Sequence, residues 1–219
     1  MAAPVPAAVP ASTLLAAPRR SPETAPTGVA ELDRLLGGLP LGAIAEIAGP
    51  ASSGRTTLAA ACLRAATSRG ECVAYIDARN AADPASLAAA GVDLERLLWV
   101  RCTGDAEAAL KAADLILHAG GFGLVCLDLG GVGARELNRI PFSCWFRFRR
   151  AVAGTRTALL VLADRPAAGG CAALRLRFEV PEPVFSGRGP GRLFRGFRSR
   201  LEGEAGGRRR GVSFRAAAA

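Results

Sequence analysis

The chain has 219 residues, of which 50% are hydrophobic, and its formal net charge is +9. This length suffices for one well-buried α/β domain with tails and excludes two large domains. No apolar run approaches the ~18 to 20 residues of a membrane-spanning helix, which excludes an integral helical membrane protein. A secretory signal is not expected either, because the N-terminal segment has no basic region followed by a compact apolar stretch, so we expect a cytoplasmic protein.

The cysteine and charge patterns limit the chemistry further. Six cysteines are scattered through apolar segments without a C-x-x-C pair, which predicts buried free thiols instead of metal ligands or disulfides. Lys111 is the only lysine, so the positive charge is almost all arginine. This excess favours attraction to polyanions or to an acidic partner protein, although a GC-rich genome would produce the same composition.

Hydrophobic periodicity predicts the organisation of the chain. Residues 1–26 repeat proline among alanines, which predicts a disordered leader. Helical spacing over 27–36 and a turn over 37–42 begin the folded core, predicted to cover 27–180. Strands are predicted at 43–48, 72–76, 97–101, 124–127, 157–162 and 173–178, and helices at 57–69, 84–90, 105–118 and 141–153. Apolar strands alternating with helices predict an α/β fold whose mostly parallel twisted sheet has helices on both faces.

The last segment has a different composition. From about Pro181 the sequence is rich in glycine, proline and arginine, which predicts a disordered basic tail over 181–219. Arginines and phenylalanines alternate in it and can contact phosphates and stack on unpaired bases. The candidates for binding single-stranded DNA are Arg188, Arg192, Phe194, Arg195, Phe197 and Arg198. A solvated end that binds nothing specific would have the same composition.

One motif predicts a nucleotide site. The residues between the first predicted strand of the core and the next helix are Gly49, Pro50, Ala51, Ser52, Ser53, Gly54, Arg55, Thr56 and Thr57. They match the phosphate-binding pattern G-x-x-x-x-G-K-[ST] except for Arg55, which replaces the lysine. Glycines let backbone N–H groups converge on phosphate oxygens, and Thr56 would place its hydroxyl on Mg²⁺.

Two features of this motif leave alternatives open. A glycine-rich strand-to-helix turn without a ligand would contain the same fixed residues. The Arg55 guanidinium is a planar group on a longer side chain, whereas the lysine ammonium is a compact point charge, so the exchange is not conservative.

Three aspartates lie where ligands bind in such folds, at the sheet edge that follows the predicted strands. They are Asp77, Asp128 and Asp164.

The stretch from Thr27 to about Val180 resembles the RecA-type recombinase core. The resemblance is carried by Thr27-Gly28, Leu32-Asp33, Gly38-Leu39-Pro40-Leu41-Gly42, Glu46-Ile47, the loop 49–58, Tyr75-Ile76-Asp77-Ala78, Ala82-Asp83-Pro84 and Gly91-Val92-Asp93-Leu94. It implies ATP binding on a central parallel sheet, with Asp83 at the nucleotide and Mg²⁺ held by Thr56 and Asp128.

The sequence departs from the family at functional positions. Arg79 replaces the glutamate that orients the attacking water, so no residue is assigned as catalytic. Ser86 replaces the adenine-stacking tyrosine, and Asp164 replaces a glutamine that senses nucleotide. The loop 164–170 is too short to line a DNA channel. The leader lacks the polymerisation helix, so no autonomous filament is expected.

These departures are similar to the shortened ImuA-like branch, whose members assist SOS mutagenesis and translesion synthesis together with an inactive polymerase-like partner. The resemblance implies an accessory protein of DNA repair that binds ATP with degenerate or absent hydrolysis. Its expected partners are single-stranded DNA or DNA repair proteins, either polymerase-like or recombinase. An active DNA-dependent ATPase or recombinase is one alternative, and a protein-interaction scaffold with a vestigial phosphate loop is another.

Overall fold

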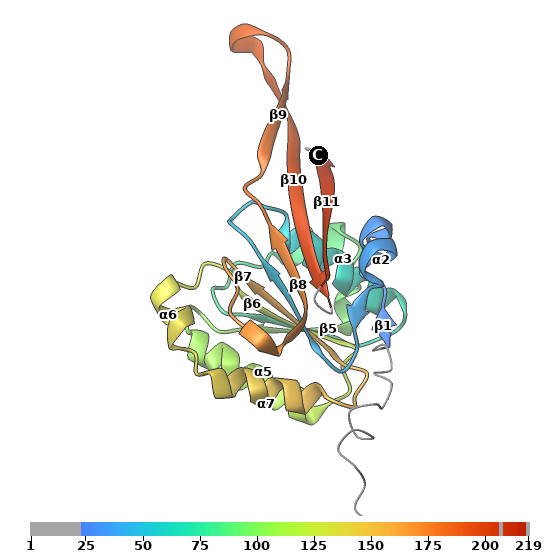
Figure 1. Cartoon of the computed structure of the whole chain (residues 1–219), viewed down its shortest axis with the longest axis vertical. Coiled ribbons are helices and arrows are strands. Elements are labelled where there is room, and N and C mark those ends of the chain that lie inside the picture. Colours follow the sequence, from blue (N-terminus) through green and yellow to red (C-terminus); the bar gives the residue numbers. More distant parts are fainter. Residues whose placement is uncertain (1–22, 206–207, 218–219) are drawn as a thin grey trace, which may run out of the picture.

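The computed structural model describes residues 23–205 and 208–217, and these residues form a nine-stranded sheet flanked by helices (Figure 1). The order of eight strands is β11-β10-β8-β3-β7-β6-β4-β5, and β9 pairs with β10 beside this path. The strands are β3 (Ile44–Ala48), β4 (Val73–Asp77), β5 (Leu97–Arg101), β6 (Leu124–Leu129), β7 (Ala158–Ala163), β8 (Ala172–Phe178), β9 (Glu182–Ser186), β10 (Leu193–Ala205) and β11 (Arg208–Ala217).

The central strands run parallel. Strand β3 pairs with β7 and β8, and β6 pairs with β7 and β4, all in parallel register. Strands β9, β10 and β11 are antiparallel to their neighbours. The predicted α/β class with a mostly parallel sheet is therefore confirmed.

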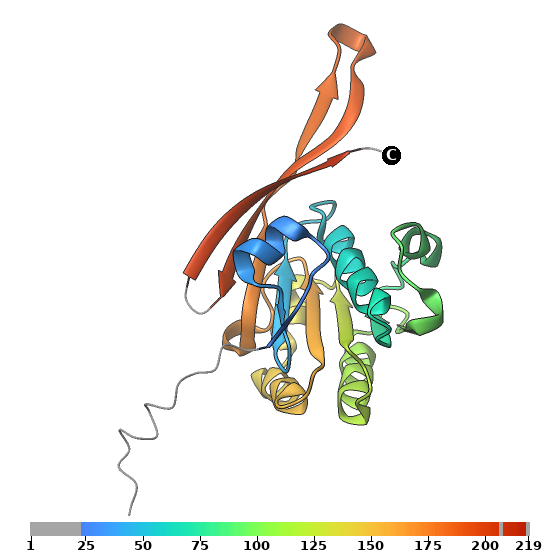
Figure 2. The ribbon, with the colours of Figure 1, turned by 90° about the vertical axis from the view of Figure 1, so that its right-hand side faces the viewer.

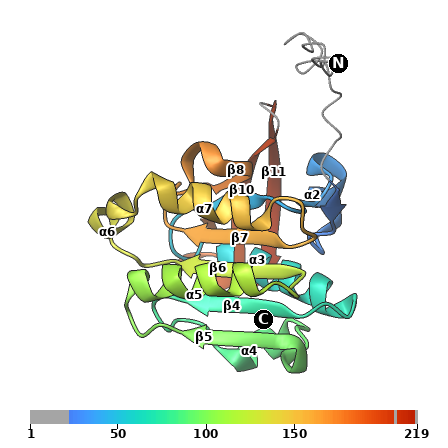
Figure 3. The ribbon, with the colours of Figure 1, turned by 90° about the horizontal axis from the view of Figure 1, so that it is seen from below.

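Helices cover both faces of the sheet. They are α2 (Ala30–Leu36), α3 (Arg55–Ser68), α4 (Pro84–Ala89), α5 (Ala106–Ala119), α6 (Ala134–Arg139) and α7 (Phe142–Val152). Alternate residues of each strand point to opposite faces. Thus Ile47 and Tyr75 belong to the core under α3, whereas Ile44 and Ile76 belong to the core under α5 and α7. Figure 3 shows α5 and α7 side by side across this second face.

The predicted disordered tail is wrong for the described residues, because β9, β10 and β11 are strands. Strand β10 pairs with β8 over five residues, and its Leu201 is completely buried. The glycine and arginine content suggested disorder, but the sheet edge at β8 supplies the hydrogen-bond partners that the local sequence cannot provide.

The predicted leader is also partly wrong. Residues 1–22 lie outside the described residues, but β1 (Thr24–Ala25) pairs with β2 (Leu39–Pro40), so order begins before residue 27. Short α6 was not predicted. None of the helices within residues 23–205 and 208–217 combines the length and the apolar composition of a membrane span.

The first part of the C-terminal hairpin, residues 182–198, is here named the arm. Figure 2 shows it projecting from the core, whereas the second part of β10 lies against the sheet. The two halves of β10 therefore have different surroundings: one half is part of the main sheet, and the other extends beyond it.

The thiols are free, as predicted, but not all are buried. Cys62, Cys102, Cys126 and Cys171 are buried, whereas Cys144 is half-buried and Cys72 is exposed. Burial raises the pKa of Cys62 to about 12, which keeps this thiol protonated and unreactive.

Candidate functional site

The phosphate loop lies between the carboxyl end of β3 and the first turn of α3, in the middle of the parallel sheet. Ser52 and Gly54 have positive φ angles of 60° and 103°, which curl the backbone. Within the described part of the chain, six N–H groups of this segment make no hydrogen bond: Ala51, Ser52, Gly54, Arg55, Thr56 and Thr57. Free N–H groups at a helix N-terminus form an anion-binding concavity.

The loop is held from both sides by the sheet. Gly49 donates its N–H to the Ala163 carbonyl at 3.2 Å. A side chain at Gly49 would place its Cβ 2.6 Å from that of Phe178, so only glycine fits. The Ser199 hydroxyl of β10 donates to the Ser53 carbonyl at 3.0 Å. The C-terminal hairpin thus contacts the phosphate loop directly.

Arg55 does not point freely into the loop. Its Nη2 lies 2.6 Å from Oδ1 of Asp164, and its side chain is only 11% exposed. Its Nη1 is buried and has no hydrogen-bond partner among the described residues. Asp164 also accepts the Gly131 N–H at 3.3 Å. Two of the positions at which this sequence departs from the RecA-type pattern therefore pair with each other.

Asp128 is the penultimate residue of β6 and lines an open cavity of about 850 Å³ together with Thr56, Arg55 and Arg79. The Tyr75 hydroxyl donates to Asp128 Oδ2 at 2.5 Å, and the Gly130 N–H donates to Oδ1 at 2.7 Å. Burial raises the pKa of Asp128, while these two hydrogen bonds and the charge of Arg55 act in the opposite direction.

The donors of this cavity fit a magnesium–phosphate group. Mg²⁺ prefers oxygen ligands and is commonly bound by one or two protein groups plus substrate phosphates. The Thr56 hydroxyl and the Asp128 carboxylate line one cavity beside the free N–H groups, which is the arrangement that such a group needs.

Arg79 also lines this cavity. Its Nη2 is 2.9 Å from Glu136 Oε2 on α6, and its Nη1 donates to the Gly104 carbonyl. The loop after β4, which carries Arg79, is fixed by buried Asp77, whose carboxylate accepts the N–H groups of Arg79, Ala81 and Ala82. Asp77 thus shapes the backbone and leaves Asp128 as the strand-end carboxylate in the cavity.

The remaining predicted nucleotide residue, Asp83, is not part of this cavity's lining. It begins α4, where its carboxylate accepts the N–H groups of Ala85 and Ser86 and the Ser86 hydroxyl at 2.6 Å. The Ser86 hydroxyl and N–H are the main causes of its lowered pKa. The described geometry of Asp83 is that of a helix cap.

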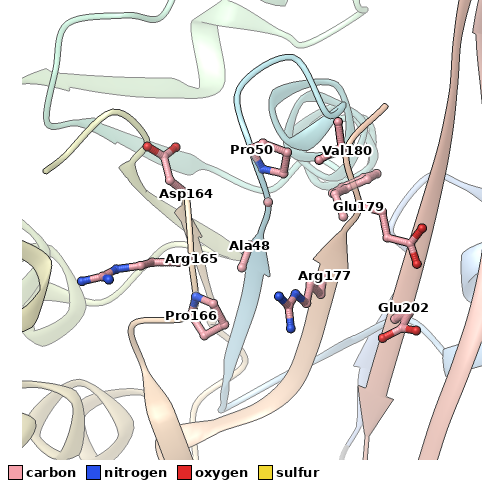
Figure 4. Close-up of a pocket in the computed structure, with 11 residues that line it drawn as sticks. Ala48, Pro50, Asp164, Arg165, Pro166, Arg177, Glu179, Val180 and Glu202 are labelled. Atoms are coloured by element: carbon pink, nitrogen blue, oxygen red, sulfur yellow. The ribbon is translucent and has the colours of Figure 1, made fainter. Parts of the chain in front are cut away.

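A second cavity of about 630 Å³ lies beside the phosphate loop, between the ends of β3, β7 and β8 (Figure 4). Arg177 points toward it, and Glu179 and Glu202 lie on its β8 and β10 side. Arg165 points away and donates to Asn138 Oδ1 at 2.6 Å. The short loop after β7 is held by buried Glu46, whose Oε1 accepts the Ala167 and Ala168 N–H groups.

The predicted DNA-binding residues lie on the arm, which projects from the core (Figure 1). Arg188, Arg192, Phe194, Arg195 and Arg198 are all exposed there, while the Phe197 side chain lies outside the described part of the structure. Phe185 was missed: its ring centroid lies 5.7 Å from that of Phe194.

Sequence reasoning also missed Tyr75, Glu136 and Ser199 as neighbours of the site. The place of Tyr75 could have been recognised from the sequence. It precedes Asp77 by two residues on a buried strand, and the end of that strand lies beside the end of the strand that carries Asp128. Glu136 and Ser199 gave no such signal, since each reaches the site from an element distant in sequence.

A phosphate loop at the carboxyl end of a central strand in a parallel sheet defines a nucleotide-binding α/β fold of the P-loop class. Residues 13–134 match the RecA N-terminal domain, which is more than half of the chain. The chain therefore belongs to the RecA N-terminal domain family.

Individual relatives agree with this assignment. Protein RecA of Bifidobacterium longum is 42% identical over 113 residues, which cover 51% of this chain and 28% of that protein. Protein RecA of Lactobacillus delbrueckii subsp. bulgaricus is 42% identical over 107 residues, covering 48% and 32%. Protein RecA of Brucella anthropi is 43% identical over 108 residues, covering 48% and 30%. The match thus spans no more than about a third of these relatives.

Proposed function

We propose that this chain is a RecA-family nucleotide-binding protein that assists DNA repair and damage tolerance, with ATP binding retained and hydrolysis degenerate or absent. One observation carries the proposal: the phosphate loop keeps its free N–H groups, while its arginine is paired with Asp164. A site that retains the free N–H groups but has no unpaired cation is better suited to binding phosphate than to transferring it.

Weak binding of ATP follows from what the loop keeps and what it lacks. The N–H groups of 51–57 and the α3 N-terminus supply a field for the phosphates, and Thr56 and Asp128 would hold Mg²⁺, which shields phosphate charge when bound. Arg55 contributes less than a free cation would, because Asp164 offsets its charge at 2.6 Å.

Slow turnover follows from Arg79. A positively charged guanidinium cannot accept a proton from an attacking water, and here it is also occupied by Glu136. Glu136 is itself committed to this ion pair, so it does not supply a free carboxylate to the cavity.

The role in DNA repair rests on the family and on relatives that are named Protein RecA. Partners are proposed to be single-stranded DNA or DNA repair proteins, polymerase-like or recombinase, in the cytoplasm. The short connection 164–171 between β7 and β8 supports the ImuA-like accessory role over that of an autonomous filament-forming recombinase.

A second candidate is a protein-interaction scaffold whose phosphate loop is vestigial. The observation that favours it is the same Arg55–Asp164 ion pair, because it satisfies Arg55 Nη2 without any ligand. The two functions differ in a single measurable property, which is magnesium-dependent nucleotide binding.

The experiment is titration with a fluorescent ATP analogue with and without Mg²⁺, followed by a phosphate-release assay with single-stranded DNA. We expect a magnesium-dependent signal that Thr56→Ala removes and that the exposed Thr24→Ala leaves unchanged. Absence of the signal at millimolar ATP supports the scaffold. Hydrolysis at recombinase-like rates in the unmodified protein contradicts the accessory function.

A further inference from the structure

The arm carries a cross-strand stack of aromatic and guanidinium groups. Phe185 on β9 and Phe194 on β10 are directly opposite each other in the antiparallel register, so both rings lie on one face. Their centroids are 5.7 Å apart at an interplanar angle of 65°. The Arg192 guanidinium carbon lies 4.8 Å from the centre of the Phe185 ring and extends the stack.

This stack faces solvent instead of a core. Phe185 is 44% exposed and Phe194 is 41% exposed, although rings of this size are normally buried. The hairpin projects away from both apolar cores of the domain (Figures 1 and 2). The cross-strand pair helps to hold the hairpin together, since an isolated two-stranded hairpin is only marginally stable. It nevertheless leaves an accessible aromatic surface.

The charge around the stack has one dominant sign. Residues 182–198 contain four arginines and a single acidic residue, Glu182. Glu182 lies 3.9 Å from Arg198, and Arg195 donates to the Ser186 hydroxyl at 2.7 Å. Arg188 and Arg192 have no carboxylate partner among the described residues. The arm therefore presents uncompensated positive charge beside exposed ring faces and edges.

We propose that the arm binds single-stranded nucleic acid, with an unpaired base stacked on the Phe185–Phe194 face and neighbouring phosphates held by Arg188 and Arg192. Ring surfaces and arginines together suit a single strand, because its bases are free to stack while its backbone is continuously anionic. A duplex hides its base faces and would use only the arginines. The inference depends on the proposed role at DNA but not on nucleotide binding.

The test measures binding of the full chain to a fluorescent oligothymidine of about 20 nucleotides, longer than the ~4 to 16 nucleotides of one compact binding surface. Phe185→Leu with Phe194→Leu keeps apolar bulk and removes the rings, so affinity should fall roughly 5- to 100-fold. Arg188→Gln with Arg192→Gln should make the slope of log affinity against log salt shallower by about 1.4, or 0.7 per contact.

Matched controls lie on the other side of the molecule. Phe142 and Phe146 of α7 form another exposed edge-to-face pair, with centroids 4.9 Å apart, and their change to leucine should leave affinity unchanged. Arg135→Gln with Arg139→Gln on α6 removes the same charge as the arm variant and should leave the salt slope unchanged. Melting temperature verifies that each variant is folded.

Any of four results would overturn the inference. Affinity and salt slope retained in both arm variants would place the nucleic-acid site elsewhere, as would losses of equal size in the α6 and α7 controls. Equal affinity for a duplex of the same length would exclude stacking. Binding of poly-glutamate that depends on the arm, without oligonucleotide binding, would assign the arm to an acidic protein partner. Nucleotide binding is measured in a separate assay, so a protein that fails to bind nucleotide can still be tested for oligothymidine binding by the arm.

Discussion

Arg55 and Asp164 form an ion pair between the first residue of α3 and the residue that follows β7, with Nη2 and Oδ1 2.6 Å apart. In the RecA-type pattern these two positions carry a lysine and a glutamine. Here Nη2 of the longer cation pairs with the new carboxylate, while Nη1 has no hydrogen-bond partner among the described residues. The pair lies beside the cavity of Thr56 and Asp128 and fixes the charge that an incoming phosphate meets.

Asp164→Asn is expected to tighten binding of the ATP analogue. The change keeps the side chain's size, removes a negative charge near the phosphates, and frees Arg55 to contact them. The gain should be about 1 kcal/mol, or roughly fivefold, because Asp164 is 42% exposed and partly screened by solvent. The control Glu95→Gln removes an exposed negative charge elsewhere and should have no effect. Unchanged affinity in Asp164→Asn would show that the ion pair does not compete with phosphate.

Restoring turnover should require three changes. Arg79→Glu supplies the missing carboxylate and Arg55→Lys supplies the missing lysine, but Arg79→Glu alone would face Glu136 across the former ion pair. Adding Glu136→Gln removes this repulsion. A positioned general base typically contributes ~10²-fold or more, so phosphate release with single-stranded DNA should rise by about that factor in the triple variant.

The double variant that retains Glu136 is the matched comparison for this assay. It should release phosphate more slowly than the triple variant, because two facing carboxylates raise each other's pKa and displace the new side chain. A triple variant as inactive as the unmodified protein would show that Arg79 and Arg55 are not what limits hydrolysis.

Magnesium-dependent binding should weaken on acidification, starting at a higher pH than an ordinary aspartate would allow. Burial raises the pKa of Asp128, and a metal ligand must be deprotonated, so the site loses affinity as the pH falls through that raised pKa. The nucleotide phosphates also titrate, and the pH profile of Asp128→Asn gives the contribution of the phosphates alone. The difference between the two pH profiles, measured with the fluorescent analogue, reports Asp128. Identical profiles would contradict its role at the metal.

The parallel core could be predicted from sequence because each of its strands and helices is specified locally. The strand at 97–101 is predicted with the bounds that the structure has, and the phosphate loop lies between the strand and helix expected for it. Periodicity and the G-x-x-x-x-G spacing concern neighbouring residues, so a single sequence contains them.

The C-terminal strands could not be predicted in the same way. Arginine and glycine are frequent in β10. It forms a strand because it pairs with β8, whose residues are not its neighbours in the sequence. One signal was present: Leu201, Gly203 and Ala205 alternate with two glutamates, which is the period of a half-buried strand. The acidic partners of Arg55 and Arg79 were equally hidden, because segments distant in sequence supply them: Asp164 follows β7, and Glu136 lies on α6.

Gly49→Ala should destabilise the protein and weaken nucleotide binding together. The added Cβ would lie 2.6 Å from the Phe178 Cβ, which is attached to the β8 backbone and cannot rotate away. Overpacking of this kind costs about 1 to 3 kcal/mol. The control is Gly133→Ala, which meets no atom within 4 Å and should change stability by less than ~0.5 kcal/mol. The urea midpoints of unfolding of the two variants test this prediction. Equal midpoints would contradict the close approach of β8 to the phosphate loop.

Truncation at Pro181 and removal of the arm alone should have different consequences. Truncation deletes β10, which exposes the β8 edge, the core around Leu201 and the Ser53 carbonyl that Ser199 satisfies. We expect a loss of at least about 3 kcal/mol, which lowers the melting temperature by roughly 6 to 12 °C in a chain of this size. Nucleotide binding should weaken with it, because the phosphate loop loses a neighbour.

The arm alone can be removed because Pro183 and Phe197 are paired directly across the hairpin. Replacing residues 184–196 by Asn-Gly closes the two strands with a two-residue turn and retains the part of β10 that pairs with β8. This variant should melt within about 2 °C of the full chain and bind the ATP analogue normally, while its affinity for oligothymidine falls. If truncation leaves the melting temperature unchanged, β10 is not part of the stable sheet. If the shortened variant melts as low as the truncated chain, the arm itself stabilises the domain.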